Sequence, residues 1–214
     1  MKFNVMLMQL MAGMFTSVQI FILTLLFSLP LGLLVALGRM SKNKILRAVV
    51  KFYIAIMRGT PLMLQLIVVY FAPFYLFSVK LKNFRFPAII IAFSINYAAY
   101  FAEIYRGGIE AIPKGQYEAA KVLGYSKVQT FLRIIMPQVI RIILPSVTNE
   151  TITLVKDTSL AFVLAQAEMF TIAKQIAAKQ ASVGPLMVAG LFYFVFNYVV
   201  AFIMEKIEKR LNYY

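Results

Sequence analysis

The sequence has 214 residues, of which 62% are hydrophobic and only 14% are charged, and its mean hydropathy is +0.81. This composition excludes a soluble globule and predicts an all-α integral membrane bundle of about five transmembrane helices, with residues 1–214 as one domain. The net charge of +14 does not indicate nucleic-acid binding, because the basic residues lie between apolar stretches, as they do in cytoplasmic loops of membrane proteins.

The first expected span covers about residues 11–38, because no charged residue occurs between Phe3 and Gly38. Pro30 predicts a kink within it. Five basic residues then crowd into residues 39–51. This cluster predicts the cytoplasmic side, so the N-terminus is expected outside and, after five spans, the C-terminus in the cytoplasm.

The second expected span, at about 59–79, begins at a helix breaker, Gly59-Thr60-Pro61. The breaker is compatible with one long broken helix and with an interfacial turn followed by a crossing. An amphipathic helix is expected outside the membrane over Glu168–Gln180, between the last two spans. The three remaining spans are expected at about 86–106, 138–164 and 183–204.

A polar passage connects the third span to the fourth and carries too many charges to lie wholly in a bilayer. Gly124 would end a short helix over about 115–125, because glycine readily adopts the left-handed conformation that closes a helix. Ser126 precedes Gln129 by three residues, which is the spacing of a capping box, so a second helix is expected to start here and run toward Pro137. The two helices predict a compact elbow that a soluble partner could grip, with an ordinary connecting loop as the alternative.

Within this passage, Glu118-Ala119-Ala120, followed by Gly124, Ile134 and Pro137, resembles the EAA loop of the membrane subunits of ATP-binding-cassette (ABC) importers. Met136 replaces the usual leucine of that pattern, one apolar residue for another. The other matching stretches are Arg58–Pro61, Tyr105–Ile109, Ile112–Gln116, Pro137-Gln138 and Lys156–Leu160. Together they resemble the polar amino-acid uptake branch of these importers.

The resemblance covers most of residues 58–160 and implies the fold of a type I ABC importer permease in the prokaryotic plasma (inner) membrane. It implies that the elbow is a coupling helix that docks on a cytoplasmic ABC ATPase dimer, which binds the ATP, so that this chain has no cofactor and is not an enzyme. A second permease subunit, identical or paralogous, and an extracytoplasmic amino-acid-binding protein are the other implied partners. The residues expected to couple to the ATPase are Gly115, Gln116, Glu118, Ala119, Ala120, Leu123 and Gly124.

Polar side chains occur inside the third and fourth expected spans, where a charge at mid-bilayer costs about 2.5 to 3.5 kcal/mol. Asn96, Tyr100 and Glu103 recur at i, i+4 and i+7, and Glu150 and Asp157 are seven apart, so each set shares a helix face. They predict a polar pocket or path for a polar or basic amino acid such as arginine, lysine, histidine or glutamine. The expected substrate-binding residues are Thr60, Asn96, Tyr100, Glu103, Glu150, Thr153 and Asp157.

Three alternatives remain open for these polar residues. In the first, Glu103 or Asp157 pairs with Lys156 or Arg58 in a purely structural ion-pair network. In the second, the carboxylates are ion sites of a secondary transporter or channel driven by an ion gradient. In the third, Glu150 and Asp157 are the carboxylate pair of a membrane enzyme.

The absent residue types limit the chemistry of the chain. Cysteine and histidine do not occur, which excludes disulfide bonds and removes the commonest metal ligands and acid–base groups. The sequence also has no GxxxxGKS or GxxxxGKT loop for nucleotide phosphates, so ATP chemistry is expected in another chain.

Overall fold

The computed structural model describes residues 3–211, and every regular element in this part of the chain is a helix, which confirms the all-α prediction. The two ends of the predicted domain 1–214 lie outside the described residues. In chain order the α-helices are α1 (Phe3–Arg39), α2 (Lys44–Gly59), α3 (Leu62–Phe77), α4 (Arg85–Glu110), α5 (Lys114–Val122), α6 (Lys127–Gln129), α7 (Met136–Asp157), α8 (Met169–Gln180) and α9 (Gly184–Leu211). A π-helical segment, η1 (Thr130–Ile135), joins α6 to α7, and a 3-10 helix, η2 (Thr158–Leu164), follows α7.

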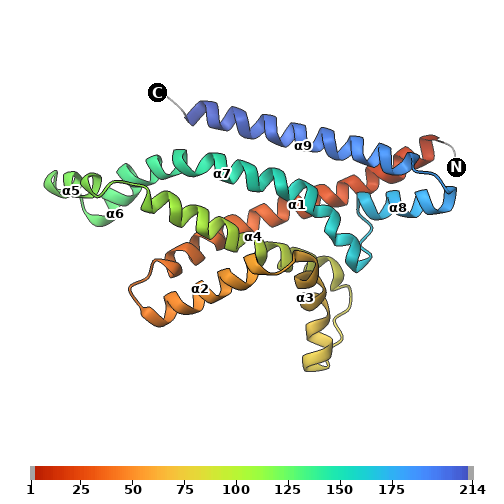
Figure 1. Ribbon diagram of the computed structural model, residues 1–214, viewed down its shortest axis with the longest axis horizontal. Helices are drawn as coiled ribbons and strands as arrows, with labels where there is room; N and C mark the ends of the chain where they lie inside the picture. Colours follow the sequence, from red (N-terminus) through yellow and green to blue (C-terminus); the bar gives the residue numbers. More distant parts are fainter. Residues whose placement is uncertain (1–2, 212–214) are drawn as a thin grey trace.

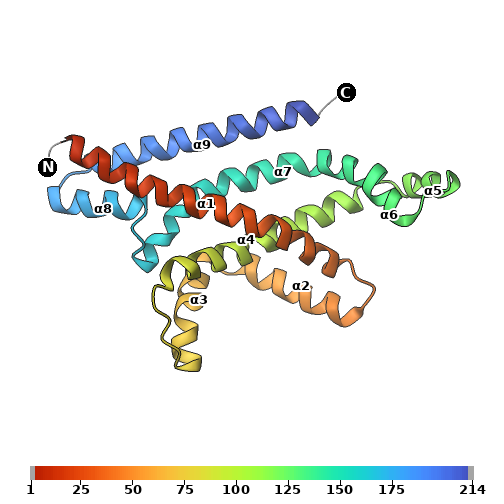
Figure 2. The same ribbon diagram turned by 180° about the vertical axis from the view of Figure 1, so that it is seen from behind.

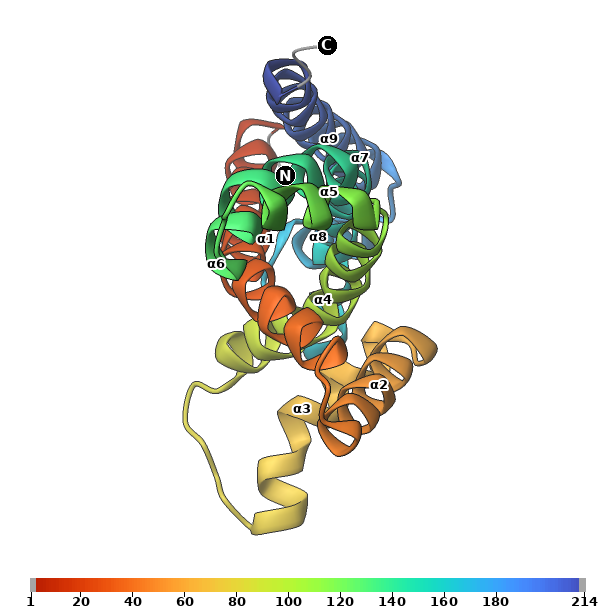
Figure 3. The same ribbon diagram turned by 90° about the vertical axis from the view of Figure 1, so that its left-hand side faces the viewer.

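The long helices lie roughly side by side, with α1, α4, α7 and α9 following the long axis of the molecule (Figures 1 and 2). Over the described residues, four helical stretches are long and apolar enough to cross a membrane, and the count reaches five if the bent pair α2–α3 is one span. Helices α5 and α6 lie at one end of the bundle, and α8 lies at the other end beside the start of α1. Seen along the long axis in Figure 3, α3 projects away from the other helices.

Close packing of α1 against α4 forms the main core. At Gly32 of α1, an added Cβ atom would lie 2.8 Å from the Cβ of Phe101 and 3.2 Å from the carbonyl oxygen of Ala98. Small residues allow this approach, which is how helices associate closely in membranes. The large residues with no exposed surface in this core are Ile20, Leu66, Ile89, Phe93, Phe101 and Leu154.

The second span is sharply broken at the predicted breaker, because α2 and α3 are bent by 113° across it. The Thr60 hydroxyl donates to the carbonyl oxygen of Ile56 at 2.8 Å and so satisfies one of the last carbonyl groups of α2. The Gln65 side chain donates to the carbonyl oxygens of Met57 and Thr60 at 3.0 and 3.2 Å, and Asn96 of α4 donates to Met57 at 3.0 Å. These amide groups satisfy the backbone carbonyls that the broken helix leaves free.

The helix after the elbow does not end at Pro137, so the expected boundary between it and the fourth span is wrong. The helical path is continuous from Lys127 to Leu164. Pro137 has no N–H and its ring would clash with the carbonyl group four residues earlier in an α-helix. The π-helical segment solves this conflict, since the Met136 N–H donates to the carbonyl oxygen of Phe131, five residues back. The α-helical part then ends at Asp157, and the polar residues that follow belong to η2.

Candidate functional site

The elbow, defined as residues 114–129, is closed by a glycine in the predicted left-handed conformation. Gly124 has φ of 79°. Its N–H donates to the carbonyl oxygen of Lys121 at 3.1 Å, and the N–H of Tyr125 donates to that of Ala120 at 3.0 Å. This pair of hydrogen bonds is a Schellman motif, which satisfies the last carbonyl groups of α5.

The predicted capping box at the start of α6 is confirmed. The backbone N–H of Gln129 donates to the Ser126 hydroxyl oxygen at 3.3 Å, and the Gln129 side-chain oxygen accepts from the N–H of Ser126 at 2.9 Å. The elbow is therefore fixed by hydrogen bonds between residues that are close in sequence.

Most of the residues expected to couple to an ATPase lie on the surface of the elbow. Ala120 is the exception, because it is buried and packs α5 back toward η1. Leu123 is 73% exposed and its neighbour Val122 is 88% exposed, although both are apolar. The exposed members of the predicted set are Gly115, Gln116, Glu118, Ala119, Leu123 and Gly124.

An apolar cluster of Ile109, Ile112, Ile135 and Val139 joins the end of α4 to η1 and the start of α7, directly before and after the elbow. At Gly108 an added Cβ atom would overlap the side chain of Ile143 and would lie 3.3 Å from that of Val139. The two helices therefore touch directly at the base of the elbow, where a displacement of one must displace the other.

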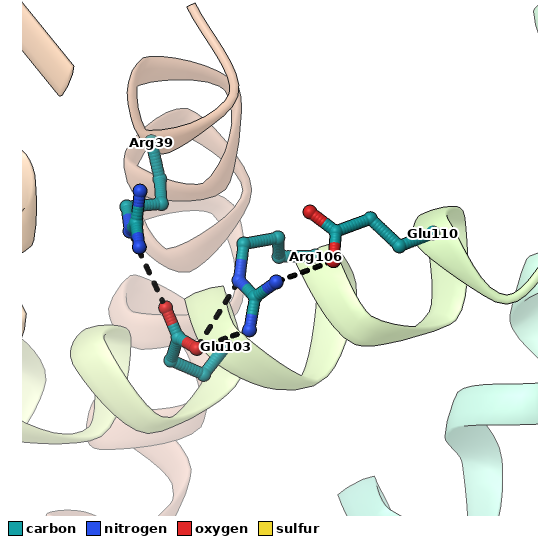
Figure 4. Close-up of polar contacts among 4 residues, drawn as sticks. All are labelled: Arg39, Glu103, Arg106 and Glu110. Carbon is teal, nitrogen blue, oxygen red and sulfur yellow. Dashed lines mark hydrogen bonds and ion pairs between the residues drawn. The ribbon is translucent and has the colours of Figure 1, made fainter.

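Glu103 lies in an ion network at the elbow end of α4 (Figure 4). Its carboxylate accepts two hydrogen bonds from the Arg106 guanidinium, at 2.7 and 3.1 Å, and lies 3.8 Å from the Arg39 Nε at the end of α1. Arg106 also pairs with Glu110 one turn further along α4. The network holds the ends of α1 and α4 together, as in the structural alternative, although the partners are Arg106 and Arg39.

A second polar group lies between α4 and α7. The hydroxyl of Tyr97, a buried residue, donates to Asp157 at 2.8 Å. The guanidinium of Arg58 stands over the ring of Tyr100, with 5.3 Å between Cζ and the ring centroid. The ring centroids of Tyr97 and Tyr100 lie 6.2 Å apart, and Glu150 lies two turns before Asp157 on the same face of α7. Two carboxylates, a guanidinium and two tyrosines thus form what we call the polar face, which consists of Arg58, Tyr97, Tyr100, Glu150 and Asp157.

The other expected substrate residues have local or structural partners. Asn96 is 4% exposed and holds the α2–α3 corner together with Thr60. The Thr153 hydroxyl donates to the carbonyl oxygen of Asn149 at 3.0 Å in its own helix. The structure therefore places Tyr100 and Asp157 on either side of Tyr97, with Glu150 two turns before Asp157 on α7. Asn96 and Thr60 meet at Gln65, and Glu103 belongs to the ion network at the end of α4.

The sequence did not reveal the roles of Gln65, Tyr97, Arg39 and Glu110 in these groups. Tyr97 lies one position after Asn96 and so falls on a neighbouring side of α4, where it counts as an ordinary apolar position. Its role depends on Asp157, 60 residues away, and no local pattern reveals that contact. Across residues 3–211, no three Asp or Glu side chains gather as a metal site would require.

Glu168 is the most deeply buried charged residue of the described chain, although the sequence predicted it at the start of an external helix. Helix α8 is amphipathic as expected, but Glu168, the residue that caps its N-terminus, is fully buried. The Glu168 carboxylate accepts from the Thr171 N–H at 2.6 Å, the Thr171 hydroxyl at 2.7 Å and the Phe170 N–H at 2.7 Å. It also accepts from Tyr193 of α9 at 3.1 Å and from Ser17 of α1 at 3.5 Å. This α8 junction, formed by Ser17, Glu168, Thr171 and Tyr193, ties α8 to both neighbouring helices.

Comparison with known proteins places this geometry in context. Residues 28–213 match the family described as "Binding-protein-dependent transport system inner membrane component". The L-cystine transport system permease protein TcyB of Bacillus subtilis (strain 168) is 37% identical over 209 residues, 96% of this chain and 87% of that protein. The putative glutamine transport system permease protein GlnP of Rickettsia bellii (strain RML369-C) is 35% identical over 98% of this chain and 96% of that protein. The arginine transport system permease protein ArtQ of Bacillus subtilis (strain 168) is 34% identical over 95% of this chain and 92% of that protein.

Solved structures agree with the architecture. A chain of an amino acid ABC transporter crystallised with histidines superposes with a TM-score of 0.86 at 30% identity, covering 98% of this chain and 99% of that one. A chain of the inward-facing methionine ABC transporter MetNI gives a TM-score of 0.79 at 17% identity, covering 99% and 100%, and this match concerns the fold alone. The comparisons support the ABC importer interpretation and not the ion-gradient-driven carrier.

Proposed function

Because the chain belongs to the family of binding-protein-dependent transport system inner membrane components, we propose that its elbow and its polar face work together in the import of a polar amino acid. The chain is a multi-pass permease subunit of the prokaryotic plasma membrane with the type I ABC importer fold. It is a transporter component and not an enzyme, since the ATPase of such a transporter is a separate subunit.

The observation that carries the proposal is the continuous helix Lys127–Leu164, which begins at the elbow and carries Glu150 and Asp157. A helix transmits displacement along its axis because its backbone hydrogen bonds make it stiff. When a cytoplasmic ATPase dimer closes, it moves the elbow, and the helix moves the polar face relative to α4. The polar face then opens alternately toward the two sides of the membrane.

The chemistry of the polar face fits an amino acid. Asp157 and Glu150 provide acceptors for an α-ammonium group, and Arg58 provides a bidentate donor for an α-carboxylate. The carboxylates also favour a cationic or polar side chain on the substrate. Relatives whose names specify cystine, glutamine and arginine support this class of substrate.

The proposed assembly contains two permease subunits, two ATPase subunits and an extracytoplasmic binding protein. The permease partner is a second copy or a paralogue, and its own polar face completes the path opposite the one described above. Family membership supports the ATPase and the binding protein as partners. The orientation with the elbow in the cytoplasm follows from the basic residues at that end.

The test compares two glycines in liposomes that contain the complete transporter, one in the elbow and one outside it. Gly124→Val forces a branched side chain into a left-handed conformation, which strains the turn by about 1 to 2 kcal/mol. Gly190→Ala in α9 is the control, because an added Cβ atom there meets no atom within 4 Å and Gly190 lies outside the residues expected to couple to the ATPase. We expect Gly124→Val to uncouple ATP hydrolysis from amino-acid uptake, while Gly190→Ala leaves both rates unchanged. Full coupling in Gly124→Val would contradict the role of the elbow.

A second comparison tests the substrate site separately. Asp157→Asn removes one carboxylate from the polar face, whereas Glu205→Gln removes an exposed carboxylate near the end of α9. We expect Asp157→Asn to raise the KM for basic amino acids at least about tenfold, the factor that corresponds to one hydrogen bond to a charged group. An unchanged KM and an unchanged preference among amino acids would contradict the proposed site but would leave the elbow proposal intact.

A further inference from the structure

Helix α2 presents three distinct faces, and two of them have no partner in the described chain. The face that packs on α1 and α4 consists of Val50, Tyr53, Ile54 and Met57. The second face is apolar and exposed, with Ile45 at 76%, Val49 at 61% and Phe52 at 67%. The third is basic and exposed, and consists of Lys44, Arg47 and Lys51. We call the last two faces together the α2 outer surface.

The positive charge of the α2 outer surface has no counter-charge nearby in sequence. No acidic residue occurs before Glu103, and that carboxylate is bound by Arg106 and Arg39. Among residues 3–211, none of the ion pairs includes a basic residue of α2. The charge is therefore balanced outside the described chain, either by ions in the solvent or by a bound anionic partner.

The position of α2 in the bundle fixes the depth of this surface in the membrane. Its packed face contacts Ala36, Ala99 and Ala102, which lie at the same end of α1 and α4 as the Arg39–Glu103 pair. The helix starts beside the end of α1 and runs back along it toward the centre of the molecule (Figures 1 and 2). Its first two turns therefore lie where the apolar helices give way to the charged elbow end.

We propose that the α2 outer surface binds anionic phospholipids of the leaflet on the elbow side. The apolar face contacts acyl chains, and the long basic side chains extend along the helix to reach the lipid phosphates. Exposed apolar residues beside basic ones on a single helix are the pattern that anionic bilayer surfaces attract. A second copy of this chain can pair through other faces, but it offers this basic surface few acidic partners, because it has only 8 acidic residues against 22 basic ones.

The chain contains no tryptophan, which permits a direct test. Phe52→Trp places a single tryptophan, which can be excited selectively over the tyrosines, on the apolar face of α2. The full-length chain is reconstituted with brominated phosphatidylglycerol or brominated phosphatidylcholine as quencher. We expect the anionic lipid to be preferred at least about fivefold, which is the preference that one basic residue near an anionic surface provides. Changing Lys44, Arg47 and Lys51 together to Gln in the Phe52→Trp background should abolish this preference.

Phe194→Trp is the matched control. Phe194 is 67% exposed, as Phe52 is, but it lies in a stretch of α9 that has no charged residue. The two lipids should therefore quench Phe194→Trp equally. Equal quenching at Phe52→Trp, a preference that survives loss of the three basic residues, or protection of Phe52→Trp from both lipids would each overturn the proposal. Because the assay needs neither ATP nor amino acid, its result is independent of the transport mechanism.

Discussion

The elbow and the α8 junction both use an oxygen-bearing side chain to cap a helix, yet they obtain their partners in opposite ways. Ser126 caps α6 in an exposed position, and both hydrogen bonds of its capping box join it to Gln129. Glu168 caps α8 with no exposed surface, and its carboxylate also accepts from Ser17 and Tyr193, which are 151 and 25 residues away. The elbow can therefore form its caps within its own sequence, whereas the α8 junction exists only after three helices have packed.

This difference has an energetic consequence. An exposed cap that is lost is replaced by water, so the damage stays small and local. A buried carboxylate that is lost leaves its donors without any acceptor, and each buried unsatisfied group costs about 1 to 3 kcal/mol. The α8 junction should therefore control the stability of the bundle, and the elbow should control only its own geometry.

The largest expected effect is at the α8 junction. Glu168→Ala should lower the free energy of unfolding by about 3 kcal/mol or more, because Thr171, Tyr193 and the Phe170 N–H lose their acceptor together. The melting temperature of the purified chain in detergent measures the loss. Glu168→Gln, which keeps one carbonyl oxygen, should lose less, and Glu205→Ala in the exposed pair with Lys209 should leave the melting temperature unchanged. Equal losses for Glu168→Ala and Glu205→Ala would remove the distinction between buried and exposed sites.

Two adjacent glycines of α4 give the next effect. Gly108→Ala should destabilise the chain by about 2 kcal/mol, because the new methyl group overlaps Ile143 of α7. Gly107→Ala meets no atom within 4 Å and should raise helix stability by up to about 1 kcal/mol. Chemical denaturation of both variants measures the difference, and the same sign for both would contradict the direct contact between α4 and α7.

Two tyrosines of α4 compare a charged with a neutral hydrogen-bond acceptor, because one donates to a carboxylate and the other to a backbone carbonyl oxygen. Tyr97→Phe should cost about 1.5 kcal/mol, because its hydroxyl donates to the Asp157 carboxylate. Tyr105→Phe should cost less than about 1 kcal/mol, since its hydroxyl donates over 3.3 Å to the neutral carbonyl oxygen of Leu29. Thermal unfolding of the two single variants tests this order, and a larger loss for Tyr105→Phe would refute it.

The smallest effect is expected in the elbow itself. Ser126→Ala removes the capping box of α6 and should cost about 1 kcal/mol, as typical N-cap changes do. Faster amide hydrogen exchange should be confined to the first residues of α6, with the melting temperature of the bundle almost unchanged. Ser126→Asp, which keeps a capping oxygen, should restore slow exchange. A drop in the melting temperature as large as that of Glu168→Ala would show that local and long-range caps do not differ.

The difference between contacts that are local in sequence and contacts between distant helices also explains how much of the fold could be predicted from the sequence. Gly124 and Ser126 act through their neighbours, so the elbow was predicted in detail and its caps are confirmed. The all-helical architecture with about five spans followed from hydropathy and is also confirmed. The continuation of the helix beyond Pro137 was missed, because a proline within a helical pattern predicts a boundary and the π-helical alternative has no sequence signature.

The site was harder to predict, because helix periodicity shows which residues share a face but not what that face meets. Asn96, Tyr100 and Glu103 were expected to form one polar stripe, but the structure gives each a different partner. Asn96 contacts a broken helix and Glu103 contacts Arg106, and neither pairing follows from the i, i+4, i+7 spacing. The roles of the expected substrate residues therefore stay predictions that the Asp157→Asn experiment addresses for one member.

The π-helical turn before Pro137 also sets the rotational phase between the elbow and the polar face. One additional residue in a turn shifts the phase of all later side chains by about 100° relative to an uninterrupted α-helix. Pro137 lacks the N–H that an α-helical turn would require and so favours the wider turn, whereas Pro145 further along is accommodated within regular α-helix. The side of α7 on which Asp157 meets Tyr97 of α4 is therefore set in part beside the elbow, 20 residues before that carboxylate.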